Sequence, residues 1–223
     1  MKYYYKDSHV TIYHGDCNEI VPALEKPDLL LTDPPYEVRA GKGGGCFGNR
    51  QHLIETGGFT DGGVDFSFLS DFPNWFCFCS RLQLPSLLSI AKSAPRWNLL
   101  TWCKTNPVPT CNNKYLPDVE FVVHAFQSGR LFGDMAVKSC FMLHPCGNKK
   151  TKHPNEKPIS IIEKLVLLGT KSKETILDPF AGSGTTGRAA KNLGRKAILI
   201  EREERYCETA ANRMLQENFD FTF

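Results

Sequence analysis

Short runs of consecutive apolar residues, each ended by turn-forming residues, recur along the chain. The first two cover residues 10–13, before Gly15, and residues 28–32, before Asp33. Uninterrupted apolar runs of this length predict strands that are buried on both faces, as in a parallel sheet. Further strand-like runs cover residues 75–79, 99–103, 120–124, 175–177 and 196–200.

Segments with helical spacing of apolar residues lie between several of these runs. The clearest begins at Pro158, which suits the first turn of a helix, and continues to Leu168. A strand, a helix and a second strand in succession form a unit whose two strands lie parallel. The sequence therefore predicts an α/β domain. Other helices are expected at residues 82–94, 185–193 and 202–216, with a helix or helical turn at 18–24.

Two regions interrupt the alternation. Residues 41–63 hold nine of the 18 glycines, so residues 37–65 are predicted to form a long mobile loop, placed to act as a lid. Pro107, Pro109 and Pro117 predict another loop, and residues 127–156 have an irregular, basic pattern. With 223 residues in all, residues 1–223 are expected to form a single domain.

Composition narrows the functional classes. Hydrophobic residues at 41% and charged residues at 23% are ordinary for a globular protein, and a net charge of +3 favours polyanionic partners only weakly. The nine cysteines include no Cys-x-x-Cys pair, so no metal site is expected. No apolar stretch approaches the ~20 residues that span a bilayer. The first residues lack a signal-peptide pattern, so we expect a cytoplasmic protein with reduced cysteines and no membrane association.

A glycine-rich turn follows the apolar run at residues 175–177. Its glycines match the dinucleotide pattern G-x-G-x-x-G, and Glu201 ends the next strand, where a ribose-binding carboxylate belongs. An NAD site is one interpretation. The presence of Asp178 favours a second interpretation, a site for S-adenosylmethionine. An anion beside the glycines repels a diphosphate and attracts the cationic methionine part of this cofactor. The turn reads Asp178-Pro179-Phe180-Ala181-Gly182-Ser183-Gly184-Thr185.

The tetrapeptide Asp33-Pro34-Pro35-Tyr36 follows a predicted buried strand and should lie at the carboxyl edge of the sheet, where α/β sites occur. By composition alone it is a proline turn. Combined with a cofactor turn it predicts an amino-methylation site. The Asp33 carboxylate and the Pro34 carbonyl can accept the two N–H bonds of an exocyclic amino group. Tyr36 offers a flat face for an extruded base.

Both segments resemble the amino-methylating DNA methyltransferases, whose motifs are D/N/S-P-P-Y/F/W and F-x-G-x-G. The tetrapeptide precedes the glycine turn, which is similar to the permuted β-type order of that family. Residues 15–17, 102–107 and 153–158 also resemble stretches typical of the group. The resemblance implies a Rossmann-like methyltransferase fold with a mostly parallel, seven-stranded sheet and circularly permuted motifs.

The same resemblance implies roles for individual residues. Asp33, Pro34, Pro35 and Tyr36 would be catalytic. Asp16 would lie near the adenine of S-adenosylmethionine, Glu201 would bind the ribose, and Lys157 and Pro158 would flank the methionine end. The complete set implied for the cofactor is Asp16, Lys157, Pro158, Asp178, Phe180, Ala181, Gly182, Ser183, Gly184, Thr185 and Glu201.

The substrate implied by the resemblance is double-stranded DNA in a restriction–modification context. Aspartate at the head of the tetrapeptide favours adenine N6, and cytosine N4 stays open. An RNA or protein amino-methyltransferase and an inactive DNA-binding protein with the same fold are further alternatives. Cofactor binding and labelling of one polymer separate these classes.

Target recognition is expected within residues 105–150. Residues 37–150, between the two motifs, are short for a dedicated recognition domain, so the protein should read a short site or use a second subunit, with a homodimer and a partner restriction nuclease both left open. His153 is expected to cap or pack rather than catalyse. Basic residues from which a few phosphate contacts are expected are Lys42, Arg50, Arg96, Lys104, Lys114, Arg130, Lys138, Lys149, Lys150 and Lys152.

Overall fold

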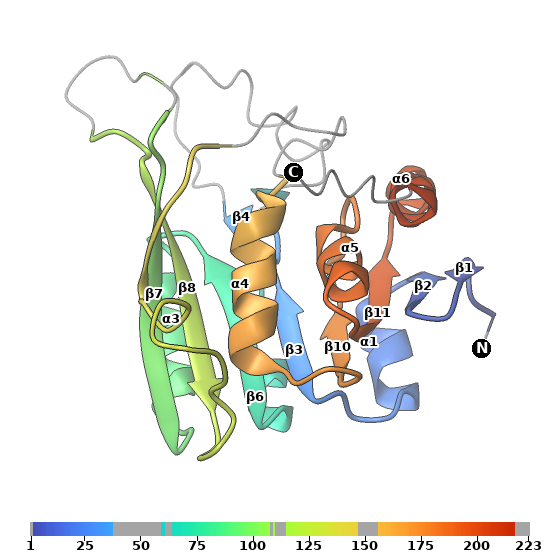
Figure 1. Ribbon diagram of the computed structural model, residues 1–223, viewed down its shortest axis with the longest axis horizontal. Coiled ribbons are helices and arrows are strands. Elements are labelled where there is room, and N and C mark those ends of the chain that lie inside the picture. The colour runs from blue at the N-terminus through green and yellow to red at the C-terminus, as the bar shows by residue number, and fades with distance from the viewer. Residues whose placement is uncertain are drawn as a thin grey trace.

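The computed structural model describes residues 2–37, 59–60, 64–107, 109, 115–146 and 156–216. Within them, one sheet has the strand order β1-β2-β11-β10-β3-β6-β8-β7-β9 (Figure 1). A separate two-stranded pair joins β4 (Tyr36–Glu37) to β5 (Phe59–Thr60). The strands of the large sheet are β1 (Tyr5–Lys6), β2 (Val10–His14), β3 (Leu29–Thr32), β6 (Asn74–Cys79), β7 (Arg96–Cys103), β8 (Val119–Phe126), β9 (Phe141–Leu143), β10 (Thr175–Asp178) and β11 (Lys196–Glu201).

The sheet is mixed, although most of its strands point the same way. Only β1 and β8 run against the other strands. The large sheet has nine strands among the described residues instead of the expected seven. The two very short strands, β1 and β9, account for the increase. In β9 only Met142 is buried, so three residues give no periodic signal, and the prediction that this stretch is irregular was wrong.

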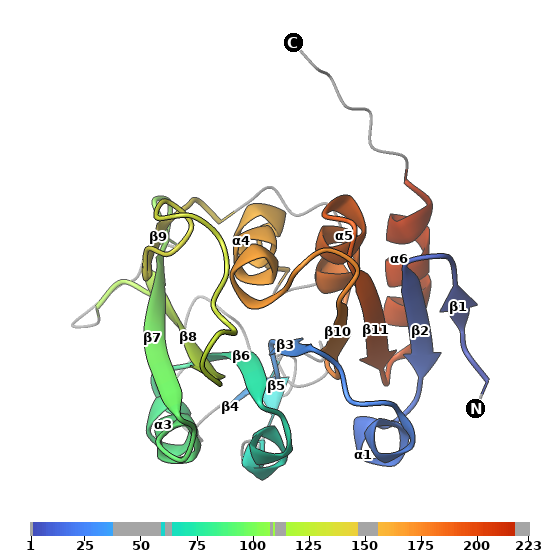
Figure 2. The ribbon, with the colours of Figure 1, turned by 60° about the horizontal axis from the view of Figure 1, so that its bottom comes forward.

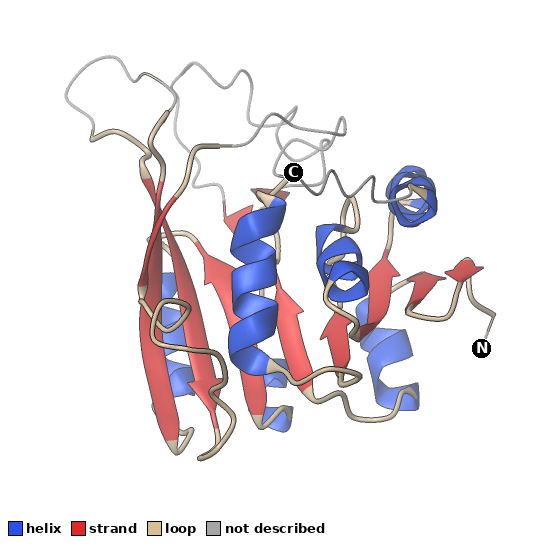
Figure 3. Cartoon of the chain, in the orientation of Figure 1, coloured by secondary structure: helices blue, strands red, loops and turns tan. Residues whose placement is uncertain are grey.

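Helices cover both faces of the sheet, so the fold has three layers (Figures 2 and 3). Apolar side chains alternate accordingly along β3. Leu29 and Leu31 pack into one hydrophobic cluster, and Leu30 packs into the other. One face carries α4 (Ile159–Gly169), α5 (Thr185–Asn192) and α6 (Glu204–Leu215), and the other carries α1 (Cys17–Ile20), the 3-10 turns η1 (Val21–Ala23) and η2 (Ser67–Asp71), and α3 (Leu84–Ala91).

The strand order places a crevice between β3 and β10. These two strands are parallel neighbours, and the chain continues from β3 to β6 on one side and from β10 to β11 on the other. Ligands of open α/β sheets bind outside the carboxyl ends of the strands at such a switch point. Asp33 directly follows β3 and Asp178 ends β10, so the fold brings both predicted motifs to this crevice.

The two insertions are described unequally. The glycine-rich segment predicted as a mobile lid, residues 37–65, lies almost wholly outside the described residues, as does His153. Within residues 105–150, the described part supplies β8 and β9 to the sheet. Among the helices of the described ranges, none combines the length and the apolar character needed to cross a membrane.

Candidate active site

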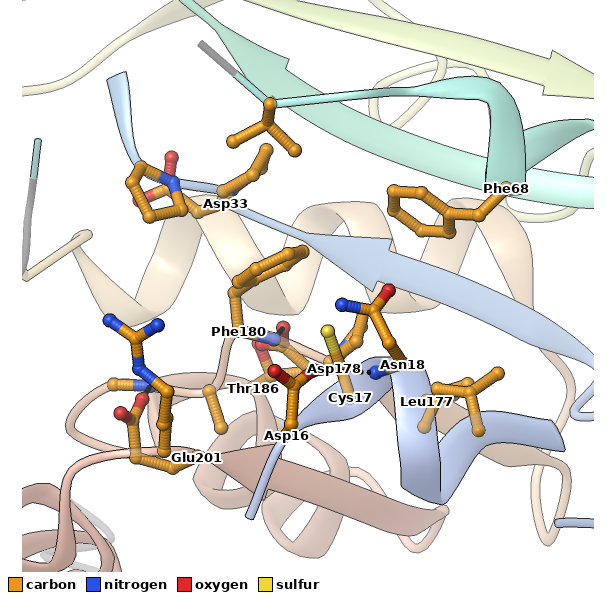
Figure 4. A pocket seen from close by; sticks show the side chains of 18 of the residues that line it. Asp16, Cys17, Asn18, Asp33, Phe68, Leu177, Asp178, Phe180, Thr186 and Glu201 are labelled. Atoms are coloured by element: carbon orange, nitrogen blue, oxygen red, sulfur yellow. Dashed lines mark hydrogen bonds between the residues drawn. The ribbon is translucent and has the colours of Figure 1, made fainter. Parts of the chain in front are cut away.

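A cavity of about 940 Å³ opens at the carboxyl edge of the sheet, where β3 and β10 end. Figure 4 shows Asp33 on one side of it and Asp16, Asp178 and Glu201 on the other. All four residues of the tetrapeptide line the cavity. The predicted cofactor residues that also line it are Asp16, Lys157, Asp178, Phe180, Ala181, Gly182, Ser183, Thr185 and Glu201.

Two predicted cofactor residues, Gly184 and Pro158, do not line the cavity. Gly184 precedes α5 with φ +78°, and a Cβ atom there would lie 2.7 Å from Cβ of Ala210 on α6. This glycine therefore lets α5 and α6 approach each other. Pro158 occupies the N-cap position of α4 and is buried.

The Asp178 carboxylate organises the glycine turn as well as facing the cavity. One oxygen accepts the backbone N–H of Phe180 at 3.1 Å, and the other accepts the Thr186 hydroxyl at 2.6 Å. Burial raises the pKa of Asp178 to about 7, with a smaller contribution from Asp33, while the two hydrogen bonds oppose the rise. A cation bound in the cavity would favour the ionised form.

Two more carboxylates lie across the cavity from Asp33. Glu201 Oε2 accepts the N–H of Gly182 at 2.8 Å, which ties the glycine turn to the end of β11, and burial raises the pKa of Glu201. Asp16 caps α1 by accepting the N–H of Asn18 at 2.8 Å. Phe180 adds an apolar wall beside Phe68, their ring centroids being 6.4 Å apart. Carboxylates for a diol and a cation, with aromatic surface between them, fit an adenosyl sulfonium.

Asp33 has two unlike oxygens. Its Oδ2 lies 2.5 Å from the Lys157 ammonium, whereas Oδ1 is buried and has no hydrogen-bond partner among the described residues. Burial raises the pKa of Asp33, Lys157 opposes that rise, and Glu120 adds to it. A buried acceptor without a donor is costly, so this oxygen at the cavity wall is available to accept a hydrogen bond from a ligand.

Gln83 supports the tetrapeptide in a way that the sequence did not reveal. This buried side chain donates from Nε2 to the carbonyl of Pro35 at 3.0 Å and accepts the Ser80 N–H and hydroxyl at 3.1 and 3.0 Å. The bond goes to Pro35 and leaves the carbonyl of Pro34 to other donors. A single glutamine beside a helix gives no sequence signal for this contact.

Glu120 and Lys104 also support the tetrapeptide, and the sequence analysis did not predict this role. Glu120 Oε2 accepts the Tyr36 hydroxyl at 2.9 Å and lies 3.2 Å from Lys157, and Oε1 lies 2.7 Å from Lys104. Although burial opposes its ionisation, Lys157 and Lys104 lower the pKa of Glu120 to about 2. The cluster therefore holds two carboxylates and two ammonium groups.

Two of the basic residues considered for DNA phosphates already have acidic partners. Lys104 pairs with Glu120 and is largely buried. Arg130 pairs with Glu174 at 3.0 Å and bonds to the Asp28 carbonyl, at the amino ends of β10 and β3, opposite the cavity. Six of the ten, namely Lys42, Arg50, Lys114, Lys149, Lys150 and Lys152, lie outside the described residues.

A buried ion pair links the segment before α4 to the glycine turn. Glu156 pairs with Arg213 of α6, whose guanidinium donates to the Thr185 hydroxyl at 2.6 Å. Lys157 follows Glu156 directly and pairs with Asp33. Adjacent residues of one segment thus link the glycine turn to the Asp33 carboxylate.

Comparison with known proteins decides between the interpretations of this site. A family model described as DNA methylase, for N6 and N4 methyltransferases, matches residues 75–212. The chain belongs to this family. Type II methyltransferase M.HinfI of Haemophilus influenzae is 30% identical, over 92% of this chain and 68% of that protein. Type II methyltransferase M2.LlaDCHI of Lactococcus lactis subsp. cremoris is 29% identical, over 96% and 92%.

Solved structures support the fold and the cofactor of this DNA methylase. The M1.HpyAVI–SAM complex has a TM-score of 0.68 and 26% identity, covering 92% of this chain and 99% of that one. PvuII DNA methyltransferase, described as cytosine-N4-specific, has a TM-score of 0.74 over 97% and 90%, but at 18% identity it shows the fold alone. The methyltransferase fold and the family are confirmed, and the cofactor is S-adenosylmethionine.

Asp178→Asn is expected to stabilise the cofactor-free protein at neutral pH. Asp178 has a folded pKa of about 7, above its usual 3.8, so between these pH values the native state keeps a proton that the unfolded state has lost, and stability falls as the pH rises. Asparagine removes that cost, by about 2–4 kcal/mol above pH 7 and by little near pH 4. Urea unfolding at pH 4.5 and 8 measures the difference. An equal change at both pH values would contradict this origin.

Proposed function

We propose that this DNA amino-methyltransferase methylates the N6 amino group of adenine in double-stranded DNA, as a Type II enzyme. The observation that carries the proposal is the buried Oδ1 of Asp33 at the wall of the cofactor cavity, which has no hydrogen-bond partner in the part of the chain that the structure describes. It can accept one N–H bond of an exocyclic amino group. Aspartate at the head of the tetrapeptide, in the resemblance described above, supports adenine over cytosine. The relatives named Type II methyltransferases support the class.

The residues have the following roles in this proposal. Asp33 Oδ1 and the Pro34 carbonyl each accept an N–H bond, so the nitrogen lone pair turns towards the methyl donor. Tyr36 stacks on the extruded base, its hydroxyl held by Glu120. S-adenosylmethionine supplies an electrophilic methyl group on sulfur. Methyl transfer to the target nitrogen would leave the C–S electron pair on sulfur, and the proton that the nitrogen loses could be accepted by Asp33.

The cofactor residues divide between the two ends of the cavity. Asp178, Lys157 and the turn residues that line the cavity, from Phe180 to Ser183 and Thr185, bind the methionine end, and Asp16 and Glu201 bind the adenosine. This division is supported by the three carboxylates on the wall that faces Asp33. A homodimer and a partner restriction nuclease, which the family resemblance leaves open, stay predictions.

Transfer of a tritiated methyl group tests the base. Duplex DNA of mixed sequence, incubated with the protein and labelled S-adenosylmethionine, is expected to yield labelled N6-methyladenine after hydrolysis and chromatography. Label in N4-methylcytosine would move the proposal to cytosine. Label in RNA or protein but not in DNA would contradict the substrate. Sequencing of methylated positions in DNA from cells that express the protein then identifies the site.

A further inference from the structure

Glu120 contacts three functional groups at once, and no motif includes it. Its carboxylate accepts the Tyr36 hydroxyl, approaches Lys157 and pairs with Lys104. We propose that Glu120 is a positioning residue for methyl transfer, holding Tyr36 and Lys157 so that only Oδ1 of Asp33 faces the target amino group. This inference rests on the function proposed above and assigns a role to a residue outside both motifs.

The direction of β8 brings Glu120 to the site. The neighbouring strands β6 and β7 end at the cavity edge of the sheet, whereas β8 runs against both and begins there. Glu120 is the second residue of β8, and Lys104 follows the end of β7. Both side chains are about 15% exposed, which removes most of the solvent screening from their interaction.

The Tyr36 hydroxyl donates a hydrogen bond to Glu120 Oε2 at 2.9 Å. The Tyr36 ring can therefore stack on a base while its hydroxyl remains hydrogen-bonded to Glu120. The Lys157 ammonium lies 5.0 Å from the centre of the Tyr36 ring and 5.2 Å from that of Phe78, so it is enclosed by two aromatic faces and two carboxylates.

Glu120 also affects the electrostatics of Asp33. Lys104 compensates the negative charge of Glu120, so the positive charge of Lys157 can stabilise the Asp33 carboxylate. The remaining negative charge of Glu120 still raises the pKa of Asp33, after the larger effects of burial and of Lys157. Loss of the Glu120 charge should therefore lower the pKa of Asp33. A residue that merely supported the fold would not change this pKa selectively.

Glu120→Gln tests the proposal, with Glu174→Gln as the matched control. Glu174 also pairs with a basic residue, Arg130, at the opposite edge of the sheet. In Glu120→Gln the amide cannot satisfy Tyr36, Lys104 and Lys157 together, so kcat is expected to fall about 100-fold, as for a displaced catalytic group. The dissociation constant of S-adenosylmethionine should stay within about twofold. The acidic limb of the kcat–pH profile should move to lower pH, and Glu174→Gln should match the wild type.

A second measurement does not depend on the substrate. Carboxyl ¹³C NMR of the cofactor-free protein, with labelled aspartate, reports the pKa of Asp33 directly. We expect a lower pKa in Glu120→Gln and an unchanged one in Glu174→Gln. An unchanged Asp33 pKa, or a kcat equal to the wild type, would overturn the role of Glu120. A wild-type protein that labels no DNA base would instead overturn the proposed function, while the NMR comparison still decides whether Glu120 acts on Asp33.

Discussion

Asp33→Ala is expected to abolish methyl transfer while S-adenosylmethionine binds nearly as in the wild type. The substitution removes the buried Oδ1, which has no hydrogen-bond partner among the described residues, and with it the acceptor for the amino N–H. Loss of one preorganised group that polarises or deprotonates the reacting atom lowers kcat by about 10²–10⁴-fold. The Asp178 and Glu201 carboxylates, on the opposite wall of the cavity, are untouched. Single-turnover labelling measures transfer, and titration calorimetry measures cofactor binding.

Asp33→Asn provides the graded control for this result. The amide retains an acceptor oxygen and the shape of the side chain, and asparagine also occurs at this position of the motif in the resemblance described above. It should retain more turnover than alanine, at a cost set by its NH₂ group facing the Lys157 ammonium. If alanine lowered turnover and cofactor affinity in equal proportion, Asp33 would belong to the cofactor site instead.

The central part of the fold could be predicted because its signals are local. The apolar runs at residues 28–32 and 175–177 predict buried parallel strands, and each ends in a motif. Parallel strands bring such motifs to one edge of the sheet. The sequence thus predicted that the tetrapeptide would lie at the carboxyl edge of the sheet, and the structure places Asp33 and Asp178 at one cavity there.

The supporting residues could not be predicted because their roles depend on long-range geometry. Glu120 reaches the site only because β8 runs against its neighbours, and an apolar run carries no direction. Gln83 reaches the Pro35 carbonyl across 48 residues of sequence. In both cases the residue type is ordinary, and only its distance in space gives it a function.

Some residues of the glycine motif are explained by backbone geometry and packing rather than by contact with a ligand. Gly184 matches the glycine pattern, yet its positive φ and its approach to Ala210 serve the packing of α5 on α6. Gly182, two residues earlier, lines the cavity and donates its N–H to Glu201. Residues of one motif can therefore have separate physical reasons for being glycine.

Lys157→Met is expected to lower both stability and turnover, because it leaves the Asp33 carboxylate buried without a counterion. The Lys157 side chain is 6% exposed and compensates Asp33 and, in part, Glu120. Removing one partner of a buried pair costs about 3–5 kcal/mol. Methionine has a similar length and keeps the contact with the Tyr36 and Phe78 rings, so the loss is mainly electrostatic.

The pH dependence of this loss identifies its cause. Without Lys157, which opposes the effect of burial, the folded pKa of Asp33 rises further above its usual 3.8. The folded state then binds a proton that the unfolded state has lost, so the stability deficit of Lys157→Met grows as the pH rises through that window. Urea unfolding at pH 5 and 8 should show the smaller deficit at pH 5, and the acidic limb of the kcat–pH profile should move to higher pH.

Adding Asp33→Asn to Lys157→Met removes the unpaired charge and should restore much of the stability at pH 8 without restoring methyl transfer. If the double variant were as unstable as Lys157→Met, the loss of stability would come from packing. The charge of Lys157 would then not be what stabilises the ionised Asp33 carboxylate.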